Sequence, residues 1–413
     1  MQWHRMPPFD LAILPVHRTM KPLIVLNLSV ISCFVSLLLS PIQARADAIS
    51  KVMQKFVEER DVSGVVTLVG LRDSVEHLEA VGKSDLAKGR DMQKDDLFWI
   101  ASMTKPMAAI CVMMLVEEGK LAVDDPLEKH LPEFKNQWLV QSKDSKQMVL
   151  CRPKRAVTVR DLLTHTSGIS EVKAPRPDCS LAELVMGYSR EPLAFEPGSK
   201  WSYSNPGINT LGRIVEIASG TPFAEFIQRR LFDPLGMKDT TFWPTKEQQA
   251  RVAKSYRQNK DTHELEETIV YFTEGKLEDR RRTPYPAGGL YSTAKDVACV
   301  YQMMLSKGTF RGQRILKPET VQLMTTTQTG DIKTGFVEGM SWGLGFQVVK
   351  EPVGVTAALA RGSFGHGGAY ATQSWADPVA GRIYILMIQR SGMPNGDGSA
   401  IREAFQNTAK GSR

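Results

Sequence analysis

Ser102 and Lys105 form a Ser-x-x-Lys pair just before a strongly apolar stretch, residues 107–118, that predicts a helix ending at Gly119. Residues three apart share one helix face, so the amine can reach the hydroxyl. A serine hydroxyl becomes a nucleophile when a neighbour takes its proton, and a lysine can do this once burial or nearby positive charge lowers its pKa. The helix N-terminus adds backbone N–H groups where an oxyanion would develop. The pair predicts acyl transfer through Ser102.

A Ser-x-x-Lys pattern is short and occurs by chance, so it needs support from other residues. A second copy runs from Ser292 to Lys295 in this chain. It precedes an amphipathic stretch, residues 293–305, and Asp296 lies three residues after Thr293. This second copy is interpreted as the cap of a helix.

The single Tyr-x-Asn of the chain, Tyr203-Ser204-Asn205, lies between a Glu-Pro-Gly turn and Pro206. A phenol at this loop can relay protons, and the amide of Asn205 can hold a substrate carbonyl. The alternative is structural: Asn205 caps a helix with Pro206 at its first position, and Tyr203 is a packing aromatic. Both interpretations stay open at this point.

His366-Gly367-Gly368 leads into a predicted strand over residues 371–376. Glycines allow a substrate to lie against a strand edge, where a backbone N–H can donate to an oxyanion. The alternative is a glycine-rich turn with a solvent-facing histidine.

Taken in order, Ser-x-x-Lys, Tyr-x-Asn and His-Gly-Gly resemble the serine β-lactamase-like superfamily of penicillin-binding DD-peptidases, β-lactamases and related esterases. The segments Phe98–Lys105, Asp161–Gly168 and Gly288–Ala294 are also similar to that family. The resemblance extends over about residues 50–405.

The resemblance implies a role for each matching residue. Ser102 is the acylated nucleophile and Lys105 its base. Tyr203 shuttles the proton to the leaving group and activates water, while Asn205 orients the substrate. The backbone N–H groups of Ser102 and Ala369 form the oxyanion hole. The mechanism implies no metal and no cofactor.

One residue departs from the β-lactamase pattern. His366 stands where many β-lactamases of this type have the lysine of Lys-Thr-Gly, which weakens the case for recognition of an antibiotic carboxylate. His366, Gly367 and Gly368 are expected to bind the substrate. Because of the departure at His366, a small ester is the favoured substrate, a D-Ala-D-Ala-like peptide amide comes next, and a β-lactam third. No feature of the sequence indicates the oligomeric state.

Two other functions are carried as alternatives. Gly339-x-Ser341-x-Gly343 matches the nucleophile elbow of α/β-hydrolases, but a predicted strand follows it instead of a helix, and Glu351 is the only acid between Ser341 and His366. The second alternative is a catalytically silent binding protein on the same scaffold, against which the retained serine, lysine and tyrosine argue.

The N-terminus predicts export to the periplasm or the medium. Lys21, an apolar run over residues 23–39 and Ala44-Arg45-Ala46 form a signal peptide, residues 1–46, in which Met20 can be the true start. The run is too short and polar for a stable membrane span. Because it continues past Cys33, lipoprotein anchoring there is disfavoured.

The net charge is +7, from 52 basic and 45 acidic residues, and this near balance does not indicate a nucleic-acid partner. No Cys-x-x-Cys occurs, so a zinc site is not expected. Cys111 and Cys299 fall on apolar helical faces, whereas Cys151 and Cys179 lie in polar loops. Whether that second pair forms a disulfide is open.

Around these residues the pattern predicts an α/β (α+β) fold with an antiparallel sheet flanked by helices. Strand-like runs occur at both ends of the chain, and short helices with long polar loops occupy the middle. The expected organisation is an α/β lobe formed by residues 47–125 and 285–413, interrupted by an all-helical lobe over residues 126–284.

Overall fold

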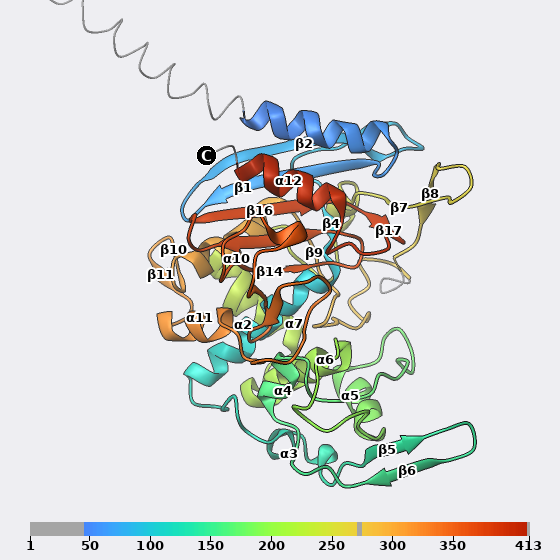
Figure 1. The fold of residues 1–413 in the computed structure, drawn as a ribbon, viewed down its shortest axis with the longest axis vertical. Coiled ribbons are helices and arrows are strands. Elements are labelled where there is room, and N and C mark those ends of the chain that lie inside the picture. Colours follow the sequence, from blue (N-terminus) through green and yellow to red (C-terminus); the bar gives the residue numbers. More distant parts are fainter. Residues whose placement is uncertain (1–44, 271–274, 411–413) are drawn as a thin grey trace, which may run out of the picture. The chain divides into compact units, whose positions relative to one another are not determined.

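The computed structural model describes residues 45–270 and 275–410, and an eight-stranded antiparallel sheet lies at its centre (Figure 1). The strand order is β12-β13-β14-β15-β16-β1-β2-β3. The bounds are Gly64–Leu71 for β1, Val75–Asp85 for β2, Arg90–Asp91 for β3, Met340–Trp342 for β12, Gln347–Val349 for β13, Phe364–Gly367 for β14, Gln373–Asp377 for β15 and Arg382–Met387 for β16. Because β1 pairs with β16, the N-terminal hairpin and the C-terminal strands form one sheet.

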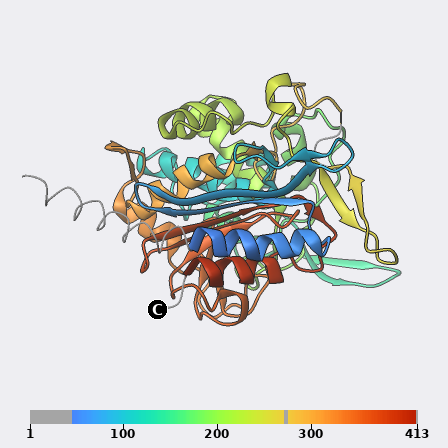
Figure 2. The same ribbon diagram turned by 90° about the horizontal axis from the view of Figure 1, so that it is seen from above.

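Side chains that alternate along the strands enter two separate cores. Ile383 and Ile385 face the core beneath α2 (Thr104–Glu117) and α10 (Ala294–Leu305). Tyr384 and Leu386 face the opposite core, which packs against the helix over residues 45–58 and against α12 (Ala400–Lys410). Figure 2 shows these two helices together on one side of the sheet. This period of two is the pattern of a strand that is covered on both faces.

The expected α/β fold with an antiparallel sheet and flanking helices is confirmed. The helices predicted over residues 107–118 and 293–305 are α2 and α10, and the strand-like runs expected at the two ends of the chain are β1 and β2 at one end and the strands from β12 to β16 at the other. Thr293 caps α10 and accepts from the Asp296 N–H at 3.2 Å. The second Ser-x-x-Lys is therefore at a helix cap, as predicted.

The segment over residues 126–284 has mixed secondary structure, which corrects the all-helical expectation. Its helices are α3 (Leu127–His130), α4 (Val159–Leu163), α5 (Leu181–Ser189), α6 (Asn205–Ser219), α7 (Phe223–Ile227), α8 (Asp233–Leu235) and α9 (Lys246–Gln249). It also has two hairpins, β5 (Leu139–Lys143) with β6 (Met148–Cys151), and β7 (Ser255–Gln258) with β8 (Leu265–Thr268). Their polar, weakly alternating sequences gave no strand signal. The division into two lobes stays a prediction.

The remaining elements are short. They are β4 (Phe98–Trp99), β9 (Tyr291–Ser292), β10 (Thr309–Phe310), β11 (Gln313–Arg314), β17 (Arg390–Ser391) and α11 (Pro318–Thr325). Among the described residues, Cys111, Cys151, Cys179 and Cys299 are free thiols, and no helix combines the length and apolar character that crossing a bilayer requires. The predicted signal peptide, Met20 and Cys33 lie outside the described residues except for residues 45–46, which begin a helix.

Candidate active site

Ser102 lies in a 3-10 turn, Ala101–Met103, between strand β4 and helix α2. The N–H of Ile100 donates to the Leu290 carbonyl at 3.0 Å, which anchors the turn to the segment before β9. Ala101 has φ +45°, a strained value for a residue with a side chain. This backbone directs the half-buried Ser102 side chain away from the core, while every residue from 104 to 115 of α2 is buried.

Lys105, in the first turn of α2, is fully buried, and its amine contacts three oxygen atoms. Nζ lies 2.6 Å from the carbonyl oxygen of Ala287, 2.8 Å from Oδ1 of Asn205 and 3.0 Å from Oγ of Ser102. The sequence motif predicted the contact with Ser102. The Ala287 and Asn205 contacts arise from distant parts of the chain.

Burial lowers the pKa of Lys105 well below its usual range, against the opposing charge of Glu171. A neutral amine has two N–H donors and one lone pair. The Ala287 carbonyl and the Asn205 amide oxygen accept from the two donors, which leaves the lone pair for the Ser102 hydroxyl. The geometry therefore suits a lysine that takes a proton from this serine.

Asn205 is available for this contact because its neighbour caps the helix. Oγ of Ser204 accepts from the Gly207 N–H at 3.0 Å, so Ser204 is the N-cap of α6 and Asn205 its first residue. The alternative in which Asn205 caps α6 is therefore wrong. Tyr203 lies nearby, with Nζ of Lys105 4.6 Å from the centroid of its ring. The serine, the lysine and the Tyr-x-Asn segment thus converge.

The Tyr203 ring packs among other aromatic side chains. Its centroid lies 5.0 Å from that of Phe336 and 4.7 Å from the His165 ring. Trp201 and Trp342 are slightly farther away. Because the ring remains half-buried, the phenol is placed between the protein interior and solvent.

His165 holds the backbone on both sides of Tyr203, a role that the sequence did not reveal. The N–H of Ser202 donates to the His165 carbonyl at 2.9 Å, and the N–H of Ser204 donates to His165 Nδ1 at 3.1 Å. Burial lowers the pKa of His165 well below its usual value, so the ring is neutral and carries its proton on Nε2. The available signal was its position in Thr-His-Thr-Ser-Gly, where it adopts φ +59°.

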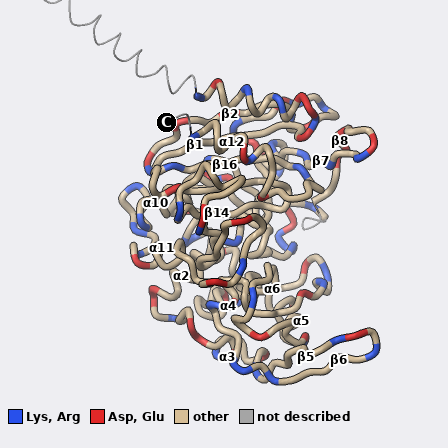
Figure 3. The backbone as a smooth tube through the Cα atoms, in the orientation of Figure 1, with Lys and Arg blue, Asp and Glu red and all other residues tan. Residues whose placement is uncertain are grey.

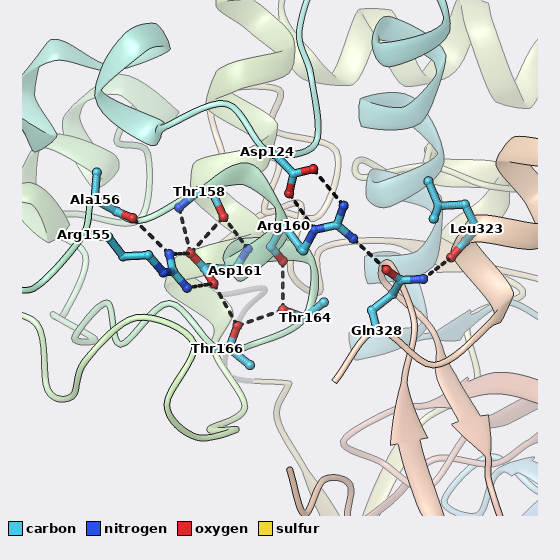
Figure 4. Close-up of polar contacts among 10 residues, drawn as sticks. All are labelled: Asp124, Arg155, Ala156, Thr158, Arg160, Asp161, Thr164, Thr166, Leu323 and Gln328. Carbon is cyan, nitrogen blue, oxygen red and sulfur yellow. Dashed lines mark hydrogen bonds and ion pairs between the residues drawn. The ribbon is translucent and has the colours of Figure 1, made fainter. Parts of the chain in front are cut away.

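A buried polar network fixes the turn that carries His165 (Figure 4). Asp161 in α4 accepts from Arg155 at 2.6 and 2.9 Å and from the Thr158 N–H at 2.8 Å. It also accepts from the Thr166 hydroxyl at 3.2 Å, and Thr166 lies 2.9 Å from the Thr164 hydroxyl. Thr164 and Thr166 flank His165 in the sequence, so this network holds the backbone on both sides of the histidine.

His366 is in β14, almost completely buried, which contradicts the solvent-facing alternative. Its Nδ1 lies 2.6 Å from the Gly367 carbonyl, and because a carbonyl only accepts, Nδ1 carries the proton. Burial and the charge of Lys105 lower the pKa of His366 to about 3. This position therefore supplies no positive charge near neutral pH.

Gly368, the second glycine of His-Gly-Gly, is closely surrounded by other parts of the chain. The Gly368 backbone lies against the turn that carries Ser102, because a Cβ at residue 368 would be 2.6 Å from the Ile100 carbonyl oxygen and 2.1 Å from Oγ1 of Thr372. Its N–H already donates to the Thr372 carbonyl at 2.8 Å. The following residue, Ala369, is exposed, and its place in the oxyanion hole stays a prediction.

A cavity of 620 Å³ adjoins this group of residues. Its lining includes Asn205, Asn209, Tyr188, Glu171 and Tyr285. Asn209 donates to the Tyr188 hydroxyl at 3.1 Å and accepts from the Ala287 N–H at 3.1 Å. The cavity wall is therefore tied to the residue whose carbonyl contacts Lys105. Its volume falls in the range of small-molecule sites.

Ser341, the alternative nucleophile, does not lie in an elbow. It is in β12, buried, and strand β13 follows it. Its hydroxyl contacts the hydroxyls of Thr327 and Thr329. An α/β-hydrolase elbow requires an exposed serine between a strand and a helix, so this alternative is wrong.

The comparison with known proteins agrees with this geometry. The family model described as Beta-lactamase matches residues 49–408. The chain belongs to the beta-lactamase family. This family member is 34% identical over 365 residues to protein Rv1367c of Mycobacterium tuberculosis, which covers 79% of this chain and 86% of the relative.

Two further matches extend the likeness. Esterase EstB of Burkholderia gladioli is 29% identical over 392 residues, covering 87% of this chain and 94% of the esterase. The structure of EstCE1, a hydrolase with promiscuous acyltransferase activity, has a TM-score of 0.73 at 22% identity, covering 90% of this chain and all of that one. The resemblance to the β-lactamase-like superfamily is confirmed, and with it the prediction of a serine hydrolase.

Proposed function

We propose that this beta-lactamase family member hydrolyses small carboxylic esters through an acyl-enzyme on Ser102. The observation that carries the proposal is the set of three oxygens around a buried Lys105 amine, one of which is the Ser102 hydroxyl. The named esterase relative supports the same substrate class.

In the proposed reaction, Lys105 takes the hydroxyl proton as Oγ of Ser102 bonds to the ester carbon. The N–H groups of Ser102 and Ala369 hold the oxyanion. The bond to the alcohol then breaks and Tyr203 supplies the alcohol with a proton, which leaves Tyr203 as a phenolate and Lys105 protonated. A water molecule gives its proton to Tyr203 as it attacks the acyl group, and Ser102 leaves with a proton from Lys105.

An ester is preferred over a β-lactam because of His366. Tight recognition of an antibiotic carboxylate is weakened without a cation at this place, and His366 is buried and neutral with its proton on Nδ1. His366, Gly367, Gly368 and Asn205 would instead bind the substrate through neutral hydrogen bonds and close backbone contact. A D-Ala-D-Ala-like peptide amide is the second candidate.

Side-by-side assays with p-nitrophenyl butyrate, a D-alanyl-D-alanine peptide and nitrocefin rank the three substrates. Intact mass after incubation with penicillin and with an activated ester shows which class acylates the protein and on which peptide. Turnover of the butyrate at or below the rate without enzyme would overturn the ester proposal, and absence of any adduct would favour a silent binding protein.

We also propose that the chain is exported, with cleavage after Ala46. The apolar run over residues 23–39 and the Ala-x-Ala sequence support this proposal. The mass of the protein recovered from the medium or the periplasm tests it, because a chain that keeps residues 1–46 would contradict cleavage.

A further inference from the structure

Hairpin β5–β6 extends away from the rest of the described structure (Figures 1 and 2). Every residue from 141 to 150 is exposed, although the sequence there includes apolar side chains. We name residues 135–155 the basic hairpin. A two-stranded ribbon exposed along this length packs little of its apolar surface, so these side chains contribute little to folding.

The apolar side chains of the basic hairpin are large. Trp138 is 46% exposed, and Met148, Val149 and Leu150 are 43%, 40% and 39% exposed. These three follow one another in β6, so both faces of the ribbon carry an apolar group. The guanidinium of Arg152 lies 3.5 Å from the Trp138 ring centroid, which holds the indole beside a cation.

The basic hairpin also has a strong excess of positive charge, visible in Figure 3. Its six cations are accompanied by a single carboxylate, that of Asp144. The cations are Lys135, Lys143, Lys146, Arg152, Lys154 and Arg155. Arg155 is bound to Asp161, but the others are exposed around the apolar side chains. The whole chain, with 52 cations and 45 anions, is nearly balanced.

We propose that the basic hairpin docks on the surface of an anionic lipid bilayer. Trp and aliphatic side chains enter the boundary between headgroups and acyl chains, while lysines beside them remain at the level of the phosphates. A second copy of the chain fits less well, because two such hairpins would bring like charges together. This proposal does not depend on the hydrolase chemistry proposed above.

The test is sedimentation with vesicles of phosphatidylcholine alone and of phosphatidylcholine mixed with phosphatidylglycerol. One double variant, Lys143→Gln with Lys146→Gln, removes positive charge. A second double variant, Met148→Ser with Leu150→Ser, removes apolar side chains. Matched controls are Lys51→Gln with Lys55→Gln and the 78% exposed Val379→Ser. All variants are made in the same chain, so any binding by its N-terminal apolar run is common to them. Circular dichroism checks folding.

The wild type is expected to sediment more with phosphatidylglycerol vesicles than without the anionic lipid, and less as salt is raised. Each hairpin variant is expected to bind about tenfold more weakly, and the controls are expected to bind as the wild type. Hairpin variants that sediment like the wild type, or a wild type that is indifferent to anionic lipid, would overturn the proposal. So would a wild-type dimer, seen by light scattering, that the hairpin variants dissociate.

Discussion

Two Ser-x-x-Lys pairs of the chain stand at the start of a helix, and only one of them is arranged as a site. Ser102 lies in the turn before α2 and Lys105 in its first turn, while Ser292 and Lys295 stand at the start of α10. In the first pair the amine is buried and 3.0 Å from the hydroxyl. In the second pair the relations are reversed: Ser292 is fully buried and lies 2.8 Å from the Thr240 hydroxyl, and Lys295 is exposed.

The difference shows what a Ser-x-x-Lys pair needs beyond its spacing. Helix geometry lets the two residues meet, but the lysine becomes a base only where its surroundings disfavour its charge. Around Lys105 the charge is disfavoured by burial beside a largely apolar helix, and the oxygen atoms of Asn205 and Ala287 hold the amine in place. Matched substitutions in the two pairs therefore test whether the Ser-x-x-Lys spacing alone or the tertiary environment of the lysine gives activity.

The largest expected effect is that of Ser102→Ala. Removal of the nucleophile is expected to lower ester kcat/KM by at least about 10³-fold and to abolish labelling by a fluorophosphonate probe. The matched Ser292→Ala variant is expected to keep labelling and activity and to lose about 1 kcal/mol of unfolding free energy, because its partner hydroxyl stays buried. Labelling that disappears in Ser292→Ala or Ser341→Ala but not in Ser102→Ala would reverse the assignment.

Lys105→Arg is expected to lower kcat by about 10²- to 10⁴-fold, because a guanidinium stays protonated and cannot accept the serine proton. The control is Lys295→Arg, which keeps the charge at an exposed site and is expected to stay within about twofold of the wild-type rate. Steady-state kinetics with p-nitrophenyl butyrate measures both. Substantial activity in Lys105→Arg would show that another group is the base.

Substitution of His165 is expected to have an intermediate effect on activity. Two variants separate its hydrogen bond to the Ser204 N–H from the contact of its ring with Tyr203. Asn tolerates positive φ and keeps an acceptor for the Ser204 N–H, whereas Phe keeps a ring and removes the acceptor. His165→Phe is expected to lower kcat about tenfold to a hundredfold with a small change in KM, since it releases the Tyr203 backbone. His165→Asn is expected to restore most of the activity. Wild-type activity in His165→Phe together with a loss in His165→Asn would indicate that the ring contact, and not the backbone contact, positions Tyr203.

The smallest effect concerns pH. As Lys105 must lose its proton to act as a base, kcat/KM is expected to rise with pH through the lowered pKa of that amine and then reach a plateau. His366 has a pKa of about 3 and is neutral over this range. The rising limb is therefore expected to keep its midpoint in His366→Asn. A midpoint that moves with this substitution would assign the limb to the histidine.

Several parts of the fold follow from local patterns in the sequence. Strand-like apolar runs at the two ends of the chain predict β1 and β16, and the apolar run after Lys105 predicts α2. The hairpins β5–β6 and β7–β8 escaped prediction because they are mostly exposed and need no apolar alternation. Without such alternation, the sequence of the middle segment predicted only helices and loops.

The site was predictable only where neighbours in sequence are neighbours in space. The amino-acid sequence by itself determined that a hydroxyl and an amine meet on one turn of helix and that a Tyr-x-Asn segment begins another. The tertiary structure decided which serine-lysine pair is buried, that Asn205 and Ala287 complete the contacts of Lys105, and that His165 holds Tyr203. The reason is physical: helix spacing is set by backbone hydrogen bonds, whereas burial and convergence depend on packing between residues that are far apart in the sequence.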